Sequence, residues 1–363
     1  MTKLPTWADL VLVPLISLVL AAAISALVIL GIGGDPVEAV KVMVDGALGS
    51  PYGWGYTLYY TTSFIFTGLG VTVAYHAGQF NIGGEGQAQL GGLGVALVCL
   101  ALPWPHWTLA LPAAMVGAAL FGAAWAAVPA WLQAKRGSHI VITTIMFNYI
   151  AAALIVYLLV EVLRPAGQMD PATPRFPKGA ALPGFHEIPG LSLIFTSKVP
   201  ANVTFFVALL ACAGVWLLLW RTRLGYEIRA FGKSNSAARY AGISPVKVIM
   251  LSMLISGGLS GLMAINNVMG EAGRLLQNSA EGAGFIGIAV ALMGRNHPLG
   301  VFLAAFLFGF LYQGGAEMGL WTSIPIELRL LVQGLVILFT GALDTMVRMM
   351  IAPFFRPRRK EAA

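Results

Sequence analysis

Apolar runs of bilayer-spanning length recur along the whole chain, and they limit the possible folds more than any other feature. A helix needs about 20 mostly apolar residues to cross a membrane, where each backbone polar group must be satisfied within the protein. Ten runs are candidates, with approximate bounds 10–32, 57–77, 83–102, 107–133, 139–163, 201–220, 245–267, 283–294, 298–316 and 327–349. We therefore expect an all-α polytopic membrane protein with about ten transmembrane helices, in which residues 1–355 form a single transmembrane domain.

The eighth run, 283–294, is shorter than the others and rich in glycine, which is typical of a re-entrant or broken helix. The distribution of charge favours counting it as a crossing. With ten crossings and both termini in the cytoplasm, 15 of the 22 Lys and Arg residues lie on the cytoplasmic side, including those of a basic tail, 356–363. Cytoplasmic loops of membrane proteins carry such an excess, so we expect both termini to be cytoplasmic.

The composition argues against nucleic-acid binding and against a metal site. Hydrophobic residues make up 58% of the chain and charged residues 10%, whereas soluble proteins have about 25% charged residues. In a polytopic protein the net charge of +7 reports orientation rather than affinity for nucleic acid. Cys99 and Cys212 lie within apolar runs and the five His residues are scattered, so neither a disulfide nor a metal site is expected.

Residues 78–86 place Gln, Asn, Glu and four glycines between two long apolar runs. Polar side chains and loosened backbone are tolerated at membrane depth only where they face protein or water, so this segment indicates a translocation path or its mouth. A polar turn between two spans is the other interpretation. Glu85 likewise has two interpretations: it faces the path, or it accepts hydrogen bonds from backbone that the glycines leave free.

A neutral solute rich in hydroxyl groups needs amide and hydroxyl partners along its path rather than fixed charge. Aromatic side chains could stack on such a solute or simply pack between helices. Asn148 lies in a strongly apolar run, so its amide must find a partner in another helix or in the path. The candidate path residues are Gln79, Phe80, Asn81, Glu85, Gln87, Asn148, Asn266 and Asn267.

Two loops are long. Residues 164–200 contain seven prolines, which predicts an extended or turn-rich outer loop that could cap the outer mouth or contact an external partner. Residues 221–247 form an inner, cytoplasmic loop with a short helix expected at 236–241, ended by Gly242. This short helix has small alanines on one side, so it could insert into a groove of another protein or be a solvated connector.

Nucleotide binding by this chain is not expected. The segment 231–234, Phe-Gly-Lys-Ser, contains the Gly-Lys pair of a phosphate-binding loop. Such a loop also needs a glycine five residues before that pair, and Glu227 occupies the position. If ATP drives this protein, another chain binds it.

Three motifs together resemble the permease subunits of bacterial ABC importers, in the branch that serves branched-chain amino acids, ribose-type sugars and nucleosides. They are GQFNIGGEGQ at 78–87, TTIMFNYIA at 143–151, and an inner-loop motif made of LGY at 224–226, RAFG at 229–232 and AARYAGI at 237–243. The second motif and the length of the chain are most similar to the longer permease of nucleoside uptake systems that use a binding lipoprotein of the basic membrane protein type.

The resemblance implies a multi-pass subunit of the bacterial cytoplasmic (inner) membrane without catalysis or a cofactor of its own. The partners it implies are an ABC ATPase subunit that uses ATP and Mg²⁺, a second and non-identical permease, and an external solute-binding lipoprotein or periplasmic protein. It also implies that the inner loop is a coupling helix that docks in the ATPase, with Arg229, Gly232, Ala237, Ala238, Arg239 and Gly242 as its residues.

The interior amide side chains and the resemblance together favour a nucleoside as the substrate, and a ribose-type sugar is the alternative. Amino acids would need charged partners for their ammonium and carboxylate groups, and the path offers few. An alternative of another class is a stand-alone, ion-coupled secondary transporter. Such transporters carry several intramembrane carboxylates or a cation site, whereas Glu85 is the single strong candidate here.

Overall fold

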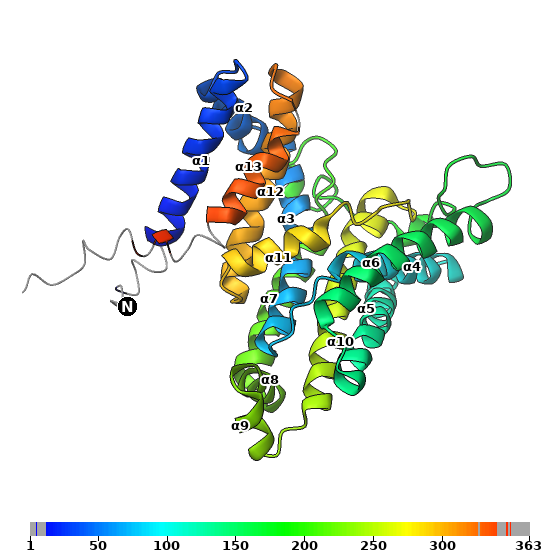
Figure 1. Ribbon diagram of the computed structural model, residues 1–363. Coiled ribbons are helices and arrows are strands. Elements are labelled where there is room, and N and C mark those ends of the chain that lie inside the picture. Colours follow the sequence, from blue (N-terminus) through cyan, green and yellow to red (C-terminus); the bar gives the residue numbers. More distant parts are fainter. Residues whose placement is uncertain (1–4, 6–11, 326, 340–345, 348, 350–363) are drawn as a thin grey trace, which may run out of the picture. The chain divides into compact units, whose positions relative to one another are not determined.

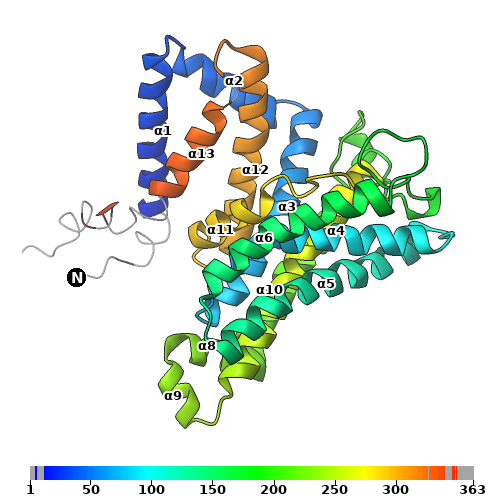
Figure 2. The same cartoon turned by 45° about the vertical axis from the view of Figure 1, so that its right-hand side comes forward.

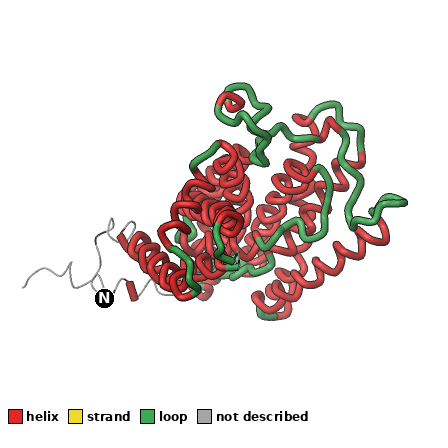
Figure 3. Tube along the Cα trace, turned by 90° about the horizontal axis from the view of Figure 1, so that it is seen from above, coloured by secondary structure: helices red, strands yellow, loops and turns green. Residues whose placement is uncertain are grey.

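The computed structural model describes residues 5, 12–325, 327–339, 346, 347 and 349. Every regular element in this part of the chain is a helix, joined by loops (Figure 3). The described residues form only isolated β-bridges, Ala172 with Leu276 and Gly184 with Asn202. The chain divides into two compact units, Leu48–Phe310 and the combination of Met1–Ala47 with Leu311–Ala363, which are described separately.

The larger unit holds most of the helices (Figure 1). Three of its helices continue into π-helical turns, at Leu132–Arg136, Leu158–Val162 and Ile265–Ala272, the last of which is labelled η6. The helices are α3 (Pro51–His76), α4 (Gly84–Ala101), α5 (Trp107–Trp131), α6 (Ile140–Tyr157), α7 (Thr204–Arg221), α8 (Arg223–Lys233), α9 (Asn235–Tyr240), α10 (Pro245–Ala264), α11 (Ala283–Met293) and the first part of α12 (Pro298–Trp321).

Helix α10 is at the centre of this unit and packs against α3, α4 and α5 (Figure 2). Glycines allow the closest approaches, because a side chain at Gly91 would overlap the backbone of Gly261, and one at Gly122 would overlap the backbone of Gly257. Small residues let helix backbones approach closely in membranes, where van der Waals packing drives helix association. The glycine content of the chain therefore serves close packing between these helices.

The smaller unit contains α1 (Val13–Gly31), most of α2 (Pro36–Leu48), the remainder of α12 and α13 (Leu328–Ile337). Helix α1 packs against α13. Backbone proximity joins α2 to α12, because a side chain added at Gly314 would meet the backbone of Met43. Glu317 of α12 accepts hydrogen bonds from Gln313 Nε2 and Trp321 Nε1, at 3.0 and 2.8 Å.

The prediction of an all-α membrane protein is confirmed. Among the described residues, six helices are long and apolar enough to cross a membrane: Val13–Gly31, Trp107–Arg136, Ile140–Val162, Thr204–Arg221, Pro245–Ala272 and Pro298–Trp321. Helices α3 and α4 are long enough but more polar, while α11 has 11 residues, or about 17 Å of helix. A bilayer core is about 30 Å thick, so ten crossings, like the orientation of the termini, remain a prediction.

The long loop 164–200 contains two one-turn 3₁₀ helices, Lys178–Ala180 and Leu191–Leu193. It is fixed to the body of its unit, since the backbone N–H of Phe176 donates to Gly273 O at 2.8 Å. Farther along, Phe185 packs against Phe195 within a buried aromatic cluster. The tail 356–363 lies outside the described residues, and the prediction of one domain over 1–355 stays a prediction.

Candidate functional site

A break in the helical chain separates α3 from α4. Gly78 adopts φ +69°, a left-handed conformation that glycine adopts without steric cost, and the backbone N–H of Gln79 then donates to Ala74 O at 3.0 Å. The chain is extended or turned until α4 begins after Gly83. Gln79 is buried in this break and its Oε1 has no hydrogen-bond partner among the described residues, while Phe80 is half-buried.

Asn81 organises the break. Its Nδ2 donates to Gln87 Oε1 at 2.9 Å and to Ser256 Oγ of α10 at 2.8 Å. Its Oδ1 accepts from the backbone N–H of Gly83 at 2.9 Å and from Gln87 Nε2 at 3.2 Å. One buried side chain therefore satisfies the start of α4 and joins it to α10, which fixes the course of the break.

Asn148 of α6 performs a similar role from the other side. Its Nδ2 donates to Ile82 O, and its Oδ1 accepts from the backbone N–H of Gly86, both at 2.9 Å. The first turn of a helix has free N–H groups, and a side chain from a neighbouring helix satisfies one of them here. The amide of Asn148 is thus paired with the backbone of α4's start within this chain.

The carboxylate of Glu85 joins the start of α4 to the start of α11. Its Oε1 accepts from the backbone N–H of Gly282 and its Oε2 from that of Gly284, both at 2.9 Å. A carboxylate at a helix N-terminus is favoured by the helix dipole and by charge-assisted hydrogen bonds. The donors belong to the segment 282–284 rather than to the glycines around Glu85. Donor and acceptor are almost 200 residues apart in the sequence.

Asn266 and Asn267 lie in a second polar cluster, within the π-helical turn η6. Asn266 Nδ2 donates to Tyr59 O and to Ser63 Oγ of α3, both at 2.9 Å, and its Oδ1 accepts from Asn202 Nδ2 at 3.0 Å. Asn267 Oδ1 accepts from Ser63 Oγ at 2.9 Å. This cluster ties α10 to α3 and to the end of the long loop.

The structure places six of the eight candidate path residues in two groups, while Gln79 and Phe80 lie in the break itself. Asn81, Glu85, Gln87 and Asn148 meet around the start of α4, whereas Asn266 and Asn267 lie in the second cluster. Sequence reasoning missed the serines and amides that pair with them, namely Ser63, Asn202 and Ser256. Small polar residues are common in spans, and nothing in the sequence singles these out. Contact of any candidate with a solute stays a prediction.

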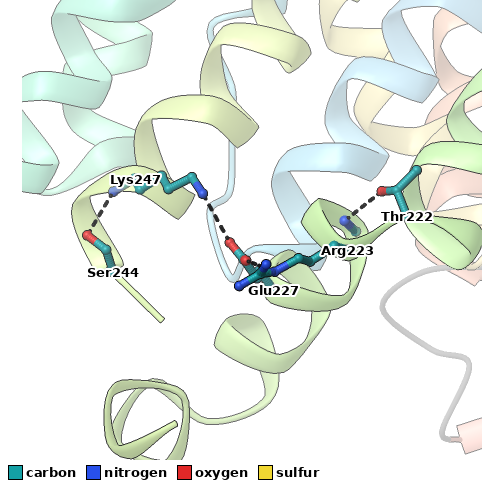
Figure 4. Close-up of polar contacts among 6 residues, drawn as sticks. Thr222, Arg223, Glu227, Ser244 and Lys247 are labelled. Carbon is teal, nitrogen blue, oxygen red and sulfur yellow. Dashed lines mark hydrogen bonds and ion pairs between the residues drawn. The ribbon is translucent and has the colours of Figure 1, made fainter. Parts of the chain in front are cut away.

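The inner loop contains two short helices beyond the ends of α7 and α10 (Figure 1, Figure 2). Thr222 starts α8, because its Oγ1 accepts from the backbone N–H of Gly225 at 3.0 Å. Glu227 then forms ion pairs with Arg223 Nε at 3.4 Å and with Lys247 Nζ of α10 at 3.6 Å (Figure 4). The Lys247 pair joins α8 to the beginning of α10, while the Arg223 pair lies within α8.

Helix α8 also packs closely against the ends of two long helices. A side chain added at Gly225 would overlap the carbonyl of Leu218 at the end of α7, and one at Gly232 would overlap the carbonyl of His76 at the end of α3. The guanidinium of Arg229 lies 5.9 Å from the Trp220 ring centroid. Of the predicted coupling residues, Arg229 and Gly232 thus pack against other parts of this chain.

Helix α9 begins one residue earlier than the sequence predicts, and its N-cap Ser234 accepts from the backbone N–H of Ala237 at 3.3 Å. Gly242, with φ +80°, follows its end. Ala237, Arg239 and Gly242 are exposed, whereas Ala238 is 3% exposed and packs inward. An open concavity of about 710 Å³ is lined by Asn235, Ser236, Arg239 and Tyr240.

A multi-pass helical bundle, with polar breaks inside it and a pair of short helices beyond one end, defines a membrane transport subunit. The chain belongs to the family described as the permease component of the branched-chain amino acid transport system, which it matches over residues 54–341. No solved structure gives a significant match. The resemblance drawn from the motifs is confirmed, as is the prediction of a permease subunit rather than an enzyme.

Characterised relatives extend along nearly the whole chain. The guanosine ABC transporter permease protein NupP of Bacillus subtilis is 36% identical over 91% of this chain and 93% of its own length. The nucleoside ABC transporter permease protein NupB of Lactococcus lactis is 33% identical over 91% and 90%. The glucose ABC transporter permease protein TsgB13 of Haloferax volcanii is 32% identical over 96% and 92%.

Proposed function

We propose that this chain is the transmembrane permease subunit of an ATP-driven ABC importer for a neutral polar solute, and that the solute is a nucleoside. The observation that carries the proposal is the similarity to NupP and NupB over about nine tenths of each chain. Because the relatives are ABC permeases, this similarity also argues against the stand-alone secondary transporter.

The polar chemistry of the chain supports a neutral solute. Around the start of α4 the side chains are amides and hydroxyls, and both oxygens of Glu85 are engaged by backbone N–H groups. A charged solute would need an opposite charge that is free to meet it. Nucleosides and sugars need hydrogen-bond partners only, so amino acids rank below both.

A ribose-type or hexose sugar is the second candidate, and a specific observation favours it. TsgB13, a glucose permease protein, covers a larger share of this chain than the nucleoside permeases do. Both solutes carry several hydroxyl groups on a ring, so one set of amide partners suits either. A direct comparison of uptake distinguishes them.

The same proposal includes the expected assembly. An ATPase subunit that uses ATP and Mg²⁺ would receive α9, a second permease would complete the path, and a solute-binding lipoprotein or periplasmic protein would deliver the solute. The chain would cross the bacterial inner membrane ten times with both termini in the cytoplasm. The exposed residues of α9 and the concavity beside them form the face that an ATPase would cover.

Uptake of a radiolabelled purine nucleoside by cells that express the whole system tests this proposal. Ala237→Arg is the informative variant, since Ala237 is exposed on α9 while Ala238 is buried within the chain. Ala237→Ser, which stays small and neutral, is the matched control. We expect Ala237→Arg to abolish uptake and co-purification of the ATPase at an unchanged membrane level, and Ala237→Ser to keep both.

Three other outcomes would change the proposal. Uptake of glucose or ribose without nucleoside uptake would identify the sugar importer. Normal uptake by Ala237→Arg together with normal ATPase retention would remove α9 from the docking surface. Uptake by the chain in the absence of any ATPase would contradict the ABC importer itself.

A further inference from the structure

Helix α11 lies between two turns that contain every non-glycine residue with left-handed backbone in the described part of the chain. The start turn, residues 278–282, contains Asn278 at φ +55° and Glu281 at φ +49°. The end turn, residues 294–297, contains Arg295 and Asn296, each at φ +53°. L side chains adopt this conformation at a cost, and residues held in it cluster at functional sites and switch regions. The two turns are therefore candidate hinges, and α11 is the helix between them.

Neighbouring helices hold both turns in place. At the start turn, the carboxylate of Glu85 accepts from the backbone N–H groups of Gly282 and Gly284, both at 2.9 Å. At the end turn, Nε2 of His76, the last residue of α3, donates to Asn296 O at 2.9 Å. Strained backbone persists only where surrounding contacts impose it. The Glu85 contact and the His76 contact therefore maintain the position in which the structure shows α11.

Glycines form the contacts of α11 with its neighbours. A side chain added at Gly284 would overlap the backbone at the start of α4, and one at Gly287 would overlap Thr67 of α3. One at Gly294, in the end turn, would overlap the backbone of Gly300 in α12. Helix surfaces without side chains between them approach closely, and packed helices can slide over one another by small distances. These contacts therefore suit a small shift of α11.

The end turn is joined to α8 through a cluster of rings. Trp220, at the end of α7, lies edge-on to His76 with ring centroids 5.3 Å apart, and its centroid is 5.1 Å from that of His297. The guanidinium of Arg229 on α8 lies 5.9 Å from the same Trp ring. Gly232 of α8 packs against the backbone carbonyl of His76. A displacement of α8 therefore reaches the end turn through direct contacts.

We infer that α11 is a moving element of the transport cycle, which shifts against α3 when a partner engages the α8–α9 loop. A strained turn needs less free energy to leave its conformation than a relaxed turn, and the His76 contact lies between the end turn and α8. The inference rests on the proposed function, because the proposed ATPase supplies the movement of α8. It identifies the helix that responds and the side chain through which it responds.

A disulfide that fixes α11 to α3 tests the movement. A Cβ atom added at Gly68 of α3 would lie 3.5 Å from Val290 Cβ of α11, and disulfides join Cβ atoms about 3.5–4.5 Å apart. The test variant is therefore Gly68→Cys with Val290→Cys. The matched control joins α10 to α5 through Gly258→Cys with Ala119→Cys, where the corresponding distance is 3.8 Å.

Both double variants are made with Cys99 and Cys212 replaced by alanine, and solute uptake by the whole system is compared before and after reduction. Comparing two redox forms of one protein removes any effect of the substitutions on folding. We expect the α3–α11 disulfide to lower uptake by about tenfold or more, reversibly, and the α5–α10 disulfide to change it by less than about twofold. If α11 is static, uptake with the α3–α11 disulfide formed would be normal, and the inference would be overturned. Formation of the control disulfide alone would overturn it too, since α11 would then not lie against α3.

The second test concerns the role of His76 as a positioning residue. His76→Phe keeps a ring beside Trp220 but removes the hydrogen bond to Asn296 O. We expect the number of ATP molecules hydrolysed per imported solute to rise by about threefold to tenfold, because hydrolysis then proceeds without the movement of α11. His139→Phe, at an exposed position before α6, is the control and should leave this ratio unchanged. A purely structural role of His76 would lower uptake and hydrolysis together, and an unchanged ratio would remove His76 from the coupling.

The readouts separate failure of this inference from failure of the proposed function. Normal uptake by the oxidised α3–α11 variant would overturn the movement of α11 and leave the importer proposal in place. If the wild type imports neither nucleosides nor sugars, the proposed substrate classes are wrong. ATP hydrolysis by the oxidised and reduced complexes then decides whether α11 moves. Absence of any ATPase from the complex would overturn both the importer and this inference.

Discussion

The break between α3 and α4 and the α8–α9 loop are both polar interruptions between helices. Polar side chains are buried in the break but exposed on α9. In the break, Asn81, Glu85 and Asn148 are buried and their side chains pair with groups of this chain. On α9, Arg239 is exposed and Tyr240 is 95% exposed. The comparison indicates that the break maintains the shape of the subunit, whereas α9 leaves its polar side chains open to solvent.

The largest stability effect is expected from the carboxylate that joins α4 to α11. Glu85→Ala removes the acceptor of two buried backbone N–H groups, and each unpaired group costs about 1–3 kcal/mol. We expect a loss of about 2–6 kcal/mol, measured as a lower midpoint of thermal unfolding in detergent. Glu161→Ala, at an exposed position, is the control and should change the midpoint little. Equal midpoints for the two variants would show that the break does not depend on Glu85.

The next effect concerns the point where the two regions touch. Gly232→Ala would push a methyl group into the carbonyl of His76 at the end of α3, next to the break. Overpacking of this kind costs about 1–3 kcal/mol, so we expect a lower unfolding midpoint and weaker coupling of ATP hydrolysis to uptake. Gly214→Ala on α7 is the matched control, because a side chain there meets no atom within 4 Å. If both variants behave alike, α8 is not packed tightly against α3.

Substitution of exposed α9 residues should leave the fold intact. Arg239→Ala removes a charge that is exposed to solvent and lines the concavity, so we expect the free energy of unfolding to change by less than about 0.5 kcal/mol. If α9 is the docking helix, retention of the ATPase during purification should nevertheless fall. A large drop in the unfolding midpoint would mean that α9 is a structural element like the break, and the contrast between the two regions would be lost.

The smallest effect is expected at the ion pairs of Glu227. Arg223 is almost fully exposed, and pairs of this kind contribute about 0–1 kcal/mol. Arg223→Ala should therefore shift the unfolding midpoint very little, and 0.5 M salt should remove what difference there is. Glu227→Ala, which removes both ion pairs at once, serves as the comparison. A marked loss in Arg223→Ala alone would show that α8 depends on this pair.

Sequence reasoning located the helices better than it located the contacts. Each of the ten apolar runs overlaps a helix, because apolar length is a local property that the chain carries in consecutive residues. Ala238 shows the limit of such reasoning. In a helix of only six residues, periodicity does not tell which side packs inward, and the structure buries Ala238 while exposing Ala237.

The sequence by itself determined the membrane class, the positions of the apolar helices, the polar break at 78–86 and the family motifs. The tertiary structure alone decided which groups those polar residues meet. Glu85 pairs with Gly282 and Gly284, Asn148 with Gly86, and Asn266 with Asn202. These partners come from distant parts of the chain, and helix packing brings them together because buried polar groups must be paired where water is absent.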